Sequence, residues 1–391
     1  MKIGIASPVD IRQLADLVGV RAETLPVGIG GAPIANLVRA MVAAGHRLSV
    51  YTFDVQAQDI RAFHGPALSL YVAPYRPRHR MRDLMRAERA AVAAMVRADR
   101  PDVVNAHWGY EFALGALAAG ARVVTTLHDW APAILRTQPT PYRAGRLVMY
   151  AGVLAKRRKH CVAAVSPYVA GRVERWTGRS CRVTPLGIPD EDLVAAPRRF
   201  PDRPPRLLAI SQGFVARKNV ESLLRALPAV RAALPGTRLA LLGYDFEPGG
   251  PAQDWAVQRG LADGVSFVGQ VPPAEVGAHL DRSDLLIHPS IEESFGMVLV
   301  EAMARAVPVI AGRSVGGPAW ILDGGQAGIL TDMMQPAAIS DAIVGLLRTP
   351  ARWERLSEAG RRRVRDRFTL SATMPGFIAA IGDILDRSHS A

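Results

Sequence analysis

Two carboxylates with a fixed spacing stand out in the segment 285–312, LLIHPSIEESFGMVLVEAMARAVPVIAG. Glu293 precedes a run that predicts a helix beginning near Gly296. Glu301 lies almost two helical turns after Ser294, on the same face and about 10 Å along the axis. A helix start offers free backbone N–H groups to a diphosphate. Because carboxylates accept hydrogen bonds from diols, Glu293 could bind sugar hydroxyls and Glu301 both ribose hydroxyls of a nucleotide-sugar. The helix dipole alone would explain acidic residues here, but not why the loop continues as Ser-Phe-Gly.

Basic and imidazole side chains could act beside these carboxylates. Lys218 precedes a helix beginning near Asn219, and a cation there would stabilise the diphosphate that leaves when a glycosidic bond breaks. Arg217, directly before it, is the nearest second cation. His128 follows a buried strand at 122–127, so we expect it at the carboxyl edge of a sheet. A solvated lysine beside an asparagine cap and a structural histidine are the alternatives.

A glycine cluster, Gly28-Ile-Gly-Gly31, opens a long helical run early in the chain. Glycine allows a backbone to approach a ligand closely, and a helix start favours phosphate groups. Gly30 and Gly31 are therefore candidate ligand-binding residues. A plain strand-to-helix turn explains the cluster equally well.

Short β-like runs alternate with amphipathic helical runs, which is the pattern of parallel sheets covered by helices. Helices are predicted between the strands, for example at 222–233 and 275–280. Ligands bind at the carboxyl ends of such strands, and two domains of this kind imply a cleft between them. The predicted strands are 3–6, 48–53, 69–72, 102–105, 122–127, 162–165, 182–185, 207–211, 238–243, 265–268, 285–288 and 309–311.

The length of 391 residues is too great for one ordinary core. The stretch 196–206, APRRFPDRPPR, predicts an exposed linker, because proline removes backbone donors and forbids helix. We therefore expect an N-terminal domain at 1–195 and a C-terminal domain at 207–370. A helix at 371–391 would pack back on the N-terminal domain.

The run P-S-x-x-E-S-F-G-x-x-x-x-E-A-M-A-x-x-x-P-V-I resembles the E-x7-E segment of family 4 retaining glycosyltransferases. The resemblance covers nearly the whole chain and implies the α/β GT-B fold, with two Rossmann-like parallel-sheet domains facing a central cleft. It implies transfer of a hexose-type sugar, with retention and without a metal, to a hydroxyl acceptor. The donor would be a nucleotide-sugar, UDP- or GDP-linked, with no further cofactor. The acceptor would be a glycan, a glycolipid or a specialised metabolite.

The resemblance also assigns roles to individual residues. The first domain would bind the acceptor through the loops 8–26, 75–89 and 130–146, and the second would bind the nucleotide-sugar. His107 also matches a family position, but we expect it to be structural. The implied catalytic residues are His128, Lys218 and Glu293. The implied donor-binding residues are Gly30, Gly31, Arg217, Lys218, Phe295, Gly296, Met297, Val298 and Glu301.

Three positions depart from the family pattern. Gly213 stands where an arginine is usual, Trp320 stands where a glutamate is common, and Leu-Gly-Ile-Pro-Asp at 186–190 replaces Asn-Gly-Val-Asp. Two alternatives therefore remain: a nucleotide-sugar-binding protein without transferase activity, and a GT-B nucleotide-sugar epimerase. The intact pair of Glu293 and Glu301 argues against the epimerase.

The formal net charge of +13, carried mostly by arginine, suits an anionic partner, although a preference for arginine over lysine explains it equally. The basic residues are scattered without aromatic interleaving, which argues against nucleic acid. The basic segments 76–89 and 156–160, predicted to lie in helices, suggest peripheral contact with an anionic membrane. Solvated helix faces are the alternative.

The cysteines Cys161 and Cys181 show neither a CxxC spacing nor a neighbouring histidine in metal-ligand register. No Asp-x-Asp element follows a strand, so no metal site is predicted. The sequence has no signal-peptide pattern at its start and no apolar run of membrane-spanning length. These features predict a cytoplasmic protein, located at the inner face of the membrane if it binds lipid.

Overall fold

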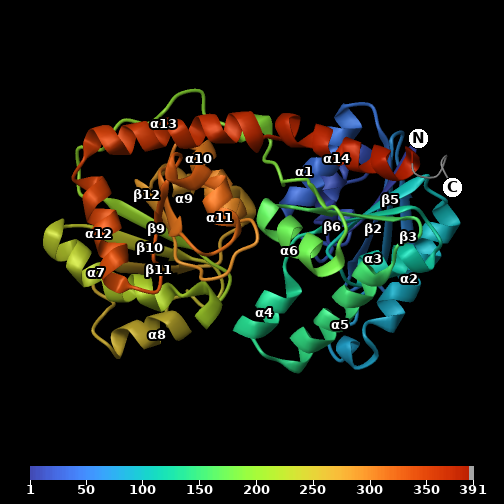
Figure 1. Ribbon diagram of the computed structural model, residues 1–391, viewed down its shortest axis with the longest axis horizontal. Coiled ribbons are helices and arrows are strands. Elements are labelled where there is room, and N and C mark those ends of the chain that lie inside the picture. Colours follow the sequence, from blue (N-terminus) through green and yellow to red (C-terminus); the bar gives the residue numbers. More distant parts are fainter. Residues whose placement is uncertain (387–391) are drawn as a thin grey trace. The chain divides into compact units, whose positions relative to one another are not determined.

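The computed structural model describes residues 1–386, which divide into two compact units (Figure 1). The first unit comprises Met1–Gly187 together with the segment that begins at Leu370. The second unit comprises Ile188–Thr369. The chain therefore passes between the units twice, at residues 187–188 and again at 369–370.

The first unit is built on an eight-stranded sheet with the order β3-β4-β2-β1-β5-β6-β7-β8 in the described residues. All neighbouring strands are parallel except β3, which runs antiparallel to β4. The central strands are buried along almost their whole length, as expected for a parallel sheet covered on both faces. The strands are β1 (Lys2–Ala6), β2 (Arg47–Asp54), β3 (Arg61–His64), β4 (Leu68–Pro74), β5 (Val103–His107), β6 (Val123–Leu127), β7 (His160–Ala164) and β8 (Arg182–Val183).

Helices and short 3-10 turns connect these strands. Thr140 and Ser166 cap two of the helices through their side-chain oxygens, and a proline follows each cap in the first turn. The helices are α1 (Ala32–Ala43), α2 (Arg86–Asp99), α3 (Glu111–Ala118), α4 (Ala131–Thr137), α5 (Pro141–Ala155), α6 (Pro167–Thr177) and α14 (Leu370–Asp386). The 3-10 turns are η1 (Ile11–Leu14), η2 (Asp16–Val18), η3 (Ala22–Thr24) and η4 (Arg80–Asp83).

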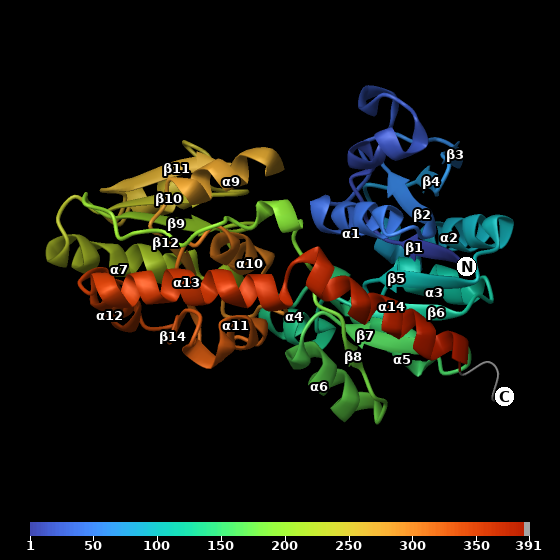
Figure 2. The same ribbon diagram turned by 90° about the horizontal axis from the view of Figure 1, so that it is seen from above.

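Helix α14 comes from the far end of the chain and packs against α1 and the strands β5, β6 and β7 (Figure 2). Its buried side chains include Phe377, Ala380 and Ile381. The sequence predicted a helix at 371–391 on the N-terminal domain; its last five residues, 387–391, lie outside the described part.

The second unit has a six-stranded, all-parallel sheet in the described residues, with the order β11-β10-β9-β12-β13-β14. Its core lies between the sheet and the helices α7, α12 and α13. The strands are β9 (Arg206–Ile210), β10 (Arg238–Leu242), β11 (Val265–Gly269), β12 (Leu285–His288), β13 (Val309–Gly312) and β14 (Ile329–Thr331). The helices are α7 (Val220–Ala233), α8 (Pro251–Val257), α9 (Pro273–Asp281), α10 (Met297–Ala304), α11 (Gly317–Ile321), α12 (Pro336–Leu347) and α13 (Pro350–Arg367), with the 3-10 turns η5 (Asp190–Asp192), η6 (Ala216–Lys218) and η7 (Asp323–Gly325).

These two sheets confirm the predicted fold class of two parallel-sheet α/β domains. The prediction of a linker between the domains at 196–206 is wrong, because this segment belongs to the second unit. Arg198 donates hydrogen bonds to the carbonyls of Asp281 and Ser283, and Phe200 packs edge-on against Trp353. Proline does exclude regular structure from the stretch, but side-chain contacts hold it on the sheet-and-helix core. The crossing point lies at 187–188 instead.

Within residues 1–386, no helix combines the length and the apolar character needed to cross a bilayer.

Candidate functional site

The two loops that carry the predicted chemistry leave neighbouring strands at the same edge of the second sheet. Lys218 lies in the loop after β9, and Glu293 lies in the loop after β12. Strands β9 and β12 are parallel neighbours, so their carboxyl ends bring the two loops together. The backbone N–H of Glu293 donates to the carbonyl of Val315 (3.0 Å), and its carbonyl accepts from the N–H of Gly317 (2.8 Å). These bonds fasten the Glu293 loop to the loop after β13.

Lys218 and Glu293 form an ion pair in this structure, with 2.9 Å between Nζ and Oε2. The Nε2 atom of His288, the last residue of β12, lies 3.3 Å from the same oxygen. Burial alone would raise the pKa of Glu293, but the charge of Lys218 and the contact with His288 hold that pKa well below its usual range. Glu293 is therefore an ionised acceptor at any physiological pH. His288 was not among the predicted site residues, because no local motif marks a strand-ending histidine.

Helix α10 begins directly after this carboxylate. Gly296 precedes the helix with a φ of 102°, a conformation that favours glycine, and no side chain caps the helix start. Ser294 therefore does not cap this helix. Met297 and Val298 begin the helix, where backbone N–H groups have no intrahelical acceptor. Such donors suit an anionic group beside the Lys218–Glu293 pair.

Phe295 is anchored under this loop by two other aromatic side chains. Its ring lies 6.2 Å from that of Trp320 and 5.8 Å from that of Phe368, and the last two rings are 5.2 Å apart. Trp320 stands where the family tends to carry glutamate, and here it serves to pack the Phe295 loop. This packing explains the departure in structural terms.

Glu301 lies on α10 in a setting that favours its neutral form. Burial and the nearby carboxylate of Asp192 raise its pKa to about 7, against the opposing charge of Arg305. Asp192 belongs to η5, more than a hundred positions earlier in the chain. The sequence did not single it out, since an acidic turn after Pro189 is an ordinary surface feature.

Arg217 does not point its guanidinium toward the lysine that follows it. Its Nη1 donates to the carbonyl of Glu292 (3.2 Å), and its own carbonyl accepts from the N–H of Ile291 (2.9 Å). Arg217 thus bridges the β9 and β12 loops through backbone groups. Gly213, where an arginine was expected, has a φ of 92°, which most side chains avoid. The local backbone therefore favours glycine at that position.

His128 lies in the first unit, just after β6, and is held by two neighbours. Its Nε2 is 2.8 Å from Nδ1 of His107, and its ring stacks on Trp108 with 3.9 Å between centroids. Burial lowers the pKa of His107 to about 3, and burial together with His107 lowers that of His128 well below the usual value. Both rings are therefore neutral at physiological pH. His107 orients the ring of His128 through this contact, which is a structural role.

The glycine cluster before α1 is packed against its own chain. A Cβ on Gly30 would lie 2.2 Å from the carbonyl carbon of Pro8, and one on Gly28 would lie 2.1 Å from the oxygen of Val9. Both glycines are required by this close approach. A Cβ on Gly31 would meet the Cδ of Pro33 at 3.6 Å, an ordinary contact distance, and Gly31 immediately precedes α1.

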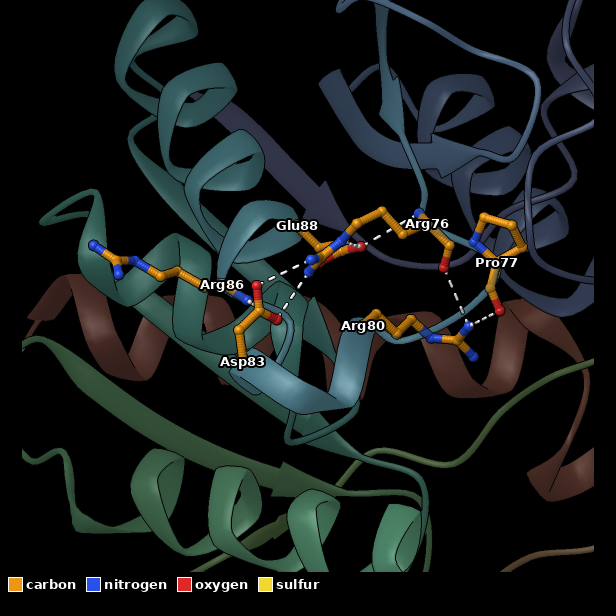
Figure 3. Close-up of polar contacts among 6 residues, drawn as sticks. All are labelled: Arg76, Pro77, Arg80, Asp83, Arg86 and Glu88. Atoms are coloured by element: carbon orange, nitrogen blue, oxygen red, sulfur yellow. Dashed lines mark hydrogen bonds and ion pairs between the residues drawn. The ribbon is translucent and has the colours of Figure 1, made fainter.

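A polar cluster occupies the carboxyl ends of β4, β5 and β6 in the first unit. Figure 3 shows its outer part, where Arg76 contacts both Asp83 (2.9 Å) and Glu88 (2.6 Å). Arg80 donates to the carbonyls of Arg76 and Pro77 and lies over the rings of Tyr75 and Tyr142. The cluster thus holds the segment after β4 in place through internal pairs.

The inner part of this cluster contains Arg146, whose guanidinium lies 3.5 Å from the ring centroid of Tyr110. Tyr110 donates to both carboxylate oxygens of Asp129 at 2.9 Å. Glu111 is 5% exposed, and burial raises its pKa despite the nearby charge of Arg146. The predicted loops 75–89 and 130–146 thus meet in one cluster of donors and acceptors. Sequence reasoning named the loops without identifying these residues.

The fold and the site together define a class of protein. The chain has two parallel-sheet α/β units, which is the GT-B arrangement. The second unit carries a lysine–glutamate pair and an uncapped helix start at the carboxyl edge of its sheet. The model described as "Glycosyl transferases group 1" matches residues 195–363, and that described as "Glycosyltransferase Family 4" matches residues 33–192. The chain belongs to the family 4 glycosyltransferases of GT-B fold.

Individual relatives agree with this membership. The GDP-mannose-dependent alpha-(1-6)-phosphatidylinositol monomannoside mannosyltransferase of Mycolicibacterium smegmatis is 34% identical over 227 residues, which are 52% of this chain and 57% of that protein. A phosphatidyl-myo-inositol mannosyltransferase of Mycobacterium leprae is 31% identical over 56% of this chain and 59% of its own length. The chain therefore spans somewhat more than half the length of these curated relatives.

Solved structures show the same fold over the full length. The sucrose-phosphate synthase of Thermosynechococcus elongatus has a TM-score of 0.77 at 22% identity, covering 100% of this chain and 99% of that one. An Anabaena protein crystallised with UDP and glucose has a TM-score of 0.64 at 17% identity and covers 100% of both chains.

Proposed function

We propose that the chain transfers a hexose-type sugar from a nucleoside-diphosphate donor to a hydroxyl acceptor, with retention of configuration and without a metal ion. The observation that carries this proposal is the Lys218–Glu293 pair, which lies directly before the uncapped start of α10. A cation and free helix N–H groups suit a diphosphate, and an ionised carboxylate beside them suits sugar hydroxyls.

In the proposed reaction the bond between the anomeric carbon and the diphosphate oxygen breaks as the acceptor hydroxyl approaches on the same face. Lys218 and the N–H groups at Met297 and Val298 stabilise the charge that develops on the diphosphate. A phosphate oxygen of the donor takes the acceptor proton, so the protein contributes position and charge. Glu301 binds the ribose hydroxyls, and Arg217 holds the loop that carries Glu293. The proposed contact of His128 with the donor sugar rests on the family resemblance.

The donor is proposed to be a GDP- or UDP-linked sugar. One relative is named as GDP-mannose-dependent, and a structure of the same fold was crystallised with UDP. For the acceptor, the cluster around Arg80, Glu111 and Arg146 offers both cationic donors and carboxylate acceptors. This mixture suits a polyhydroxylated acceptor that carries an anionic group. Relatives are named for phosphatidylinositol mannoside and inositol 3-phosphate.

A second candidate is a nucleotide-sugar-binding protein that performs no transfer. The specific observation in its favour is Gly213, since the position that usually supplies an arginine has no side chain, and Arg217 is occupied with the carbonyl of Glu292. Lys218 would then be the one cation of this loop directed at the diphosphate.

The test uses the full chain with GDP-mannose and UDP-glucose, each offered with a panel of cyclitols, cyclitol phosphates and phosphoinositides. Mass spectrometry should detect a product heavier than the acceptor by one hexose residue, and NMR should show the donor's anomeric configuration retained. The Lys218→Ala variant should give no product. Donor binding without any product across the panel would favour the binding protein, and conversion of the donor sugar without an acceptor would indicate an epimerase.

A further inference from the structure

Helix α5 is apolar on its exposed face as well as on its buried face. Met149, Tyr150, Val153 and Leu154 are buried, as expected for the core side. The opposite face presents Ala144, Val148 and Ala155 to solvent, and Val148 is 59% exposed. After Arg146 the helix contains no charged residue. A solvated helix normally carries polar side chains on this face, so the exposed face of α5 is suited to an apolar partner.

An apolar hollow of about 480 Å³ adjoins this face. It is lined by Trp130, Pro132, Leu147 and Trp176, together with Arg172 and Arg175 at its rim. Trp176, near the end of α6, is 46% exposed although its ring stacks on Tyr150 of α5. Indole rings beside arginines are typical of surfaces that meet a lipid headgroup layer, where the ring is amphipathic and the cation meets phosphate.

A run of four basic residues follows α5 directly. Lys156, Arg157, Arg158 and Lys159 are all exposed, and no ion pair joins them to a carboxylate within residues 1–386. Arg157 donates to the carbonyl of Thr177, so this run lies beside the residue that follows Trp176. The sequence predicted that this run was helical. That prediction is wrong, because α5 ends at Ala155 and the run forms the turn that leads into β7.

In the other basic segment, 76–89, part of the positive charge is paired within the first unit. Arg76 is paired with Asp83 and Glu88, and Arg80 donates to backbone carbonyls (Figure 3). These two cations therefore serve the fold of the first unit, whereas Arg78, Arg82 and Arg86 of the same segment are exposed. The run 156–159 is distinguished by its position, because it directly follows the apolar face of α5 and lies beside Trp176.

We propose that this surface, formed by the exposed face of α5, the Trp130–Trp176 hollow and the basic run 156–159, docks the protein on an anionic lipid bilayer. The apolar side chains would enter the boundary between headgroups and acyl chains, while the lysines and arginines contact lipid phosphates. Charge complementarity and exposed indole select a membrane over a protein partner. Trp130 and Ala144 of this surface also belong to the segment 130–146 proposed to bind the acceptor. The proposal does not depend on the proposed sugar transfer, since its test measures binding to vesicles in the absence of any donor.

The test measures co-sedimentation of the full chain with two kinds of vesicle. One is phosphatidylcholine alone, and the other contains equal parts of phosphatidylcholine and phosphatidylglycerol. The protein should sediment with the anionic vesicles only, and rising salt should release it. Equal binding to both vesicles, or to neither, would overturn the proposal. A partner protein on this surface would give the second of these results.

Two matched pairs of variants locate the contact. Val148→Asp should weaken binding to anionic vesicles about tenfold or more, whereas Val257→Asp, at an equally exposed valine (58%) in α8, should not. The triple change Lys156→Glu, Arg158→Glu and Lys159→Glu should lower the partition coefficient about a hundredfold. The same number of charges is reversed in the second unit by Arg282→Glu, Arg352→Glu and Arg355→Glu, which should have a much smaller effect.

The two pairs of variants also distinguish a loss of membrane binding from a loss of folding. Val148 is exposed, so its replacement should leave the thermal midpoint unchanged. If Val148→Asp fails to fold, the triple variant decides, since its sites lie in a surface turn. Equal losses in a patch variant and its control would show that net charge alone drives binding, and the proposed surface would be wrong.

Discussion

Glu301 is unusual among the site carboxylates because its pKa lies near neutrality while that of Glu293 lies far below. The cause is local: Glu301 is partly buried beside the carboxylate of Asp192, whereas Glu293 is paired with Lys218. The two carboxylates of the E-x7-E segment therefore differ in charge over the physiological range. A hydrogen bond from a ribose hydroxyl favours the ionised form of Glu301 and would compete with proton binding.

We expect the affinity for a nucleoside diphosphate to rise with pH through the region near 7. The pKa of Glu301 is about 7, and below this pH the side chain must lose a proton before it can accept hydrogen bonds from both ribose hydroxyls. In that range the affinity should therefore rise by up to about tenfold per pH unit. Above it the affinity should level off. Isothermal titration calorimetry across this range provides the measurement.

The Glu301→Gln variant is the control, since the phosphates of the ligand titrate in the same region. Its profile should retain only the ligand's own titration and should show weaker binding at high pH. Identical profiles for the wild type and the variant would remove the ribose assignment.

Because Lys218 and Glu293 form an ion pair, we expect their substitutions to have coupled effects on the free energy of unfolding as well as effects on turnover. Lys218→Met leaves an ionised Glu293 in a mostly buried place, so the free energy of unfolding should fall by about 2–3 kcal/mol. Adding Glu293→Gln should recover part of this loss, because the buried charge is then gone. Turnover should fall about a hundredfold or more in each single variant and should not recover in the double variant.

Urea unfolding of the four proteins gives the coupling energy, and initial rates give the catalytic comparison. If the two single effects on stability simply add, the pair is not coupled in the free protein.

At the residue scale the sequence identified candidate site residues, but it did not identify the side chains that interact with them. The spacing in 285–312 pointed to Glu293 and Glu301, and the neighbouring element pointed to Lys218. The partners that set their charge, His288 and Asp192, come from a strand end and from a turn far away in the chain. Neither has a local pattern, so only the folded arrangement of β12 and η5 reveals them.

At the scale of elements, the approach of α11 to the Glu293 loop is unusually close. A Cβ on Gly317 would lie 2.5 Å from the carbonyl oxygen of Ser294 and 2.8 Å from Cα of Phe295. Both of these atoms belong to backbone, which cannot turn aside as a side chain can. The glycine therefore sets the distance between the first turn of α11 and the loop that carries the site.

Gly317→Ala should push these two elements apart. We expect the free energy of unfolding to fall by about 1–3 kcal/mol and nucleoside-diphosphate binding to weaken, as measured by denaturant titration and calorimetry.

Gly345→Ala in α12 is the matched control, because a Cβ there meets no atom within 4 Å. Its stability should stay unchanged or rise by up to about 1 kcal/mol, since alanine favours helix. Equal effects of the two substitutions would mean that the contact at Gly317 does not constrain the loop.

Apolar runs predicted most strands to within a few residues, because buried parallel strands are nearly continuous in hydrophobicity. Two strands escaped prediction. The edge strand β3 is mostly exposed and carries the polar side chains of Arg61 and His64, and β14 has three residues, too few to show a pattern. The linker was misplaced for a related reason, since prolines mark irregular backbone without showing whether that backbone is packed.

At the scale of the whole molecule, the proposed reaction needs no metal ion. The charge on the diphosphate would be met by Lys218 and by the N–H groups that begin α10. Transfer by the full chain should therefore continue at an unchanged rate in excess EDTA, as measured by product formation. Lys218→Ala supplies the inactive baseline. Loss of product in EDTA, with recovery on adding magnesium or manganese, would contradict this prediction.

The discontinuity of the first unit has a consequence for how the protein is made. Residues 188–369 form one uninterrupted stretch, so on the ribosome the second unit can fold as soon as it has emerged. The first unit must wait for α14, which supplies Phe377, Ile381 and Ile384 to cover α1 and strands β5–β7. During that interval the nascent chain carries an uncovered apolar surface on a unit whose sheet was synthesised first. A chaperone that binds such surfaces could therefore engage the first unit throughout the synthesis of residues 188–369, until α14 emerges.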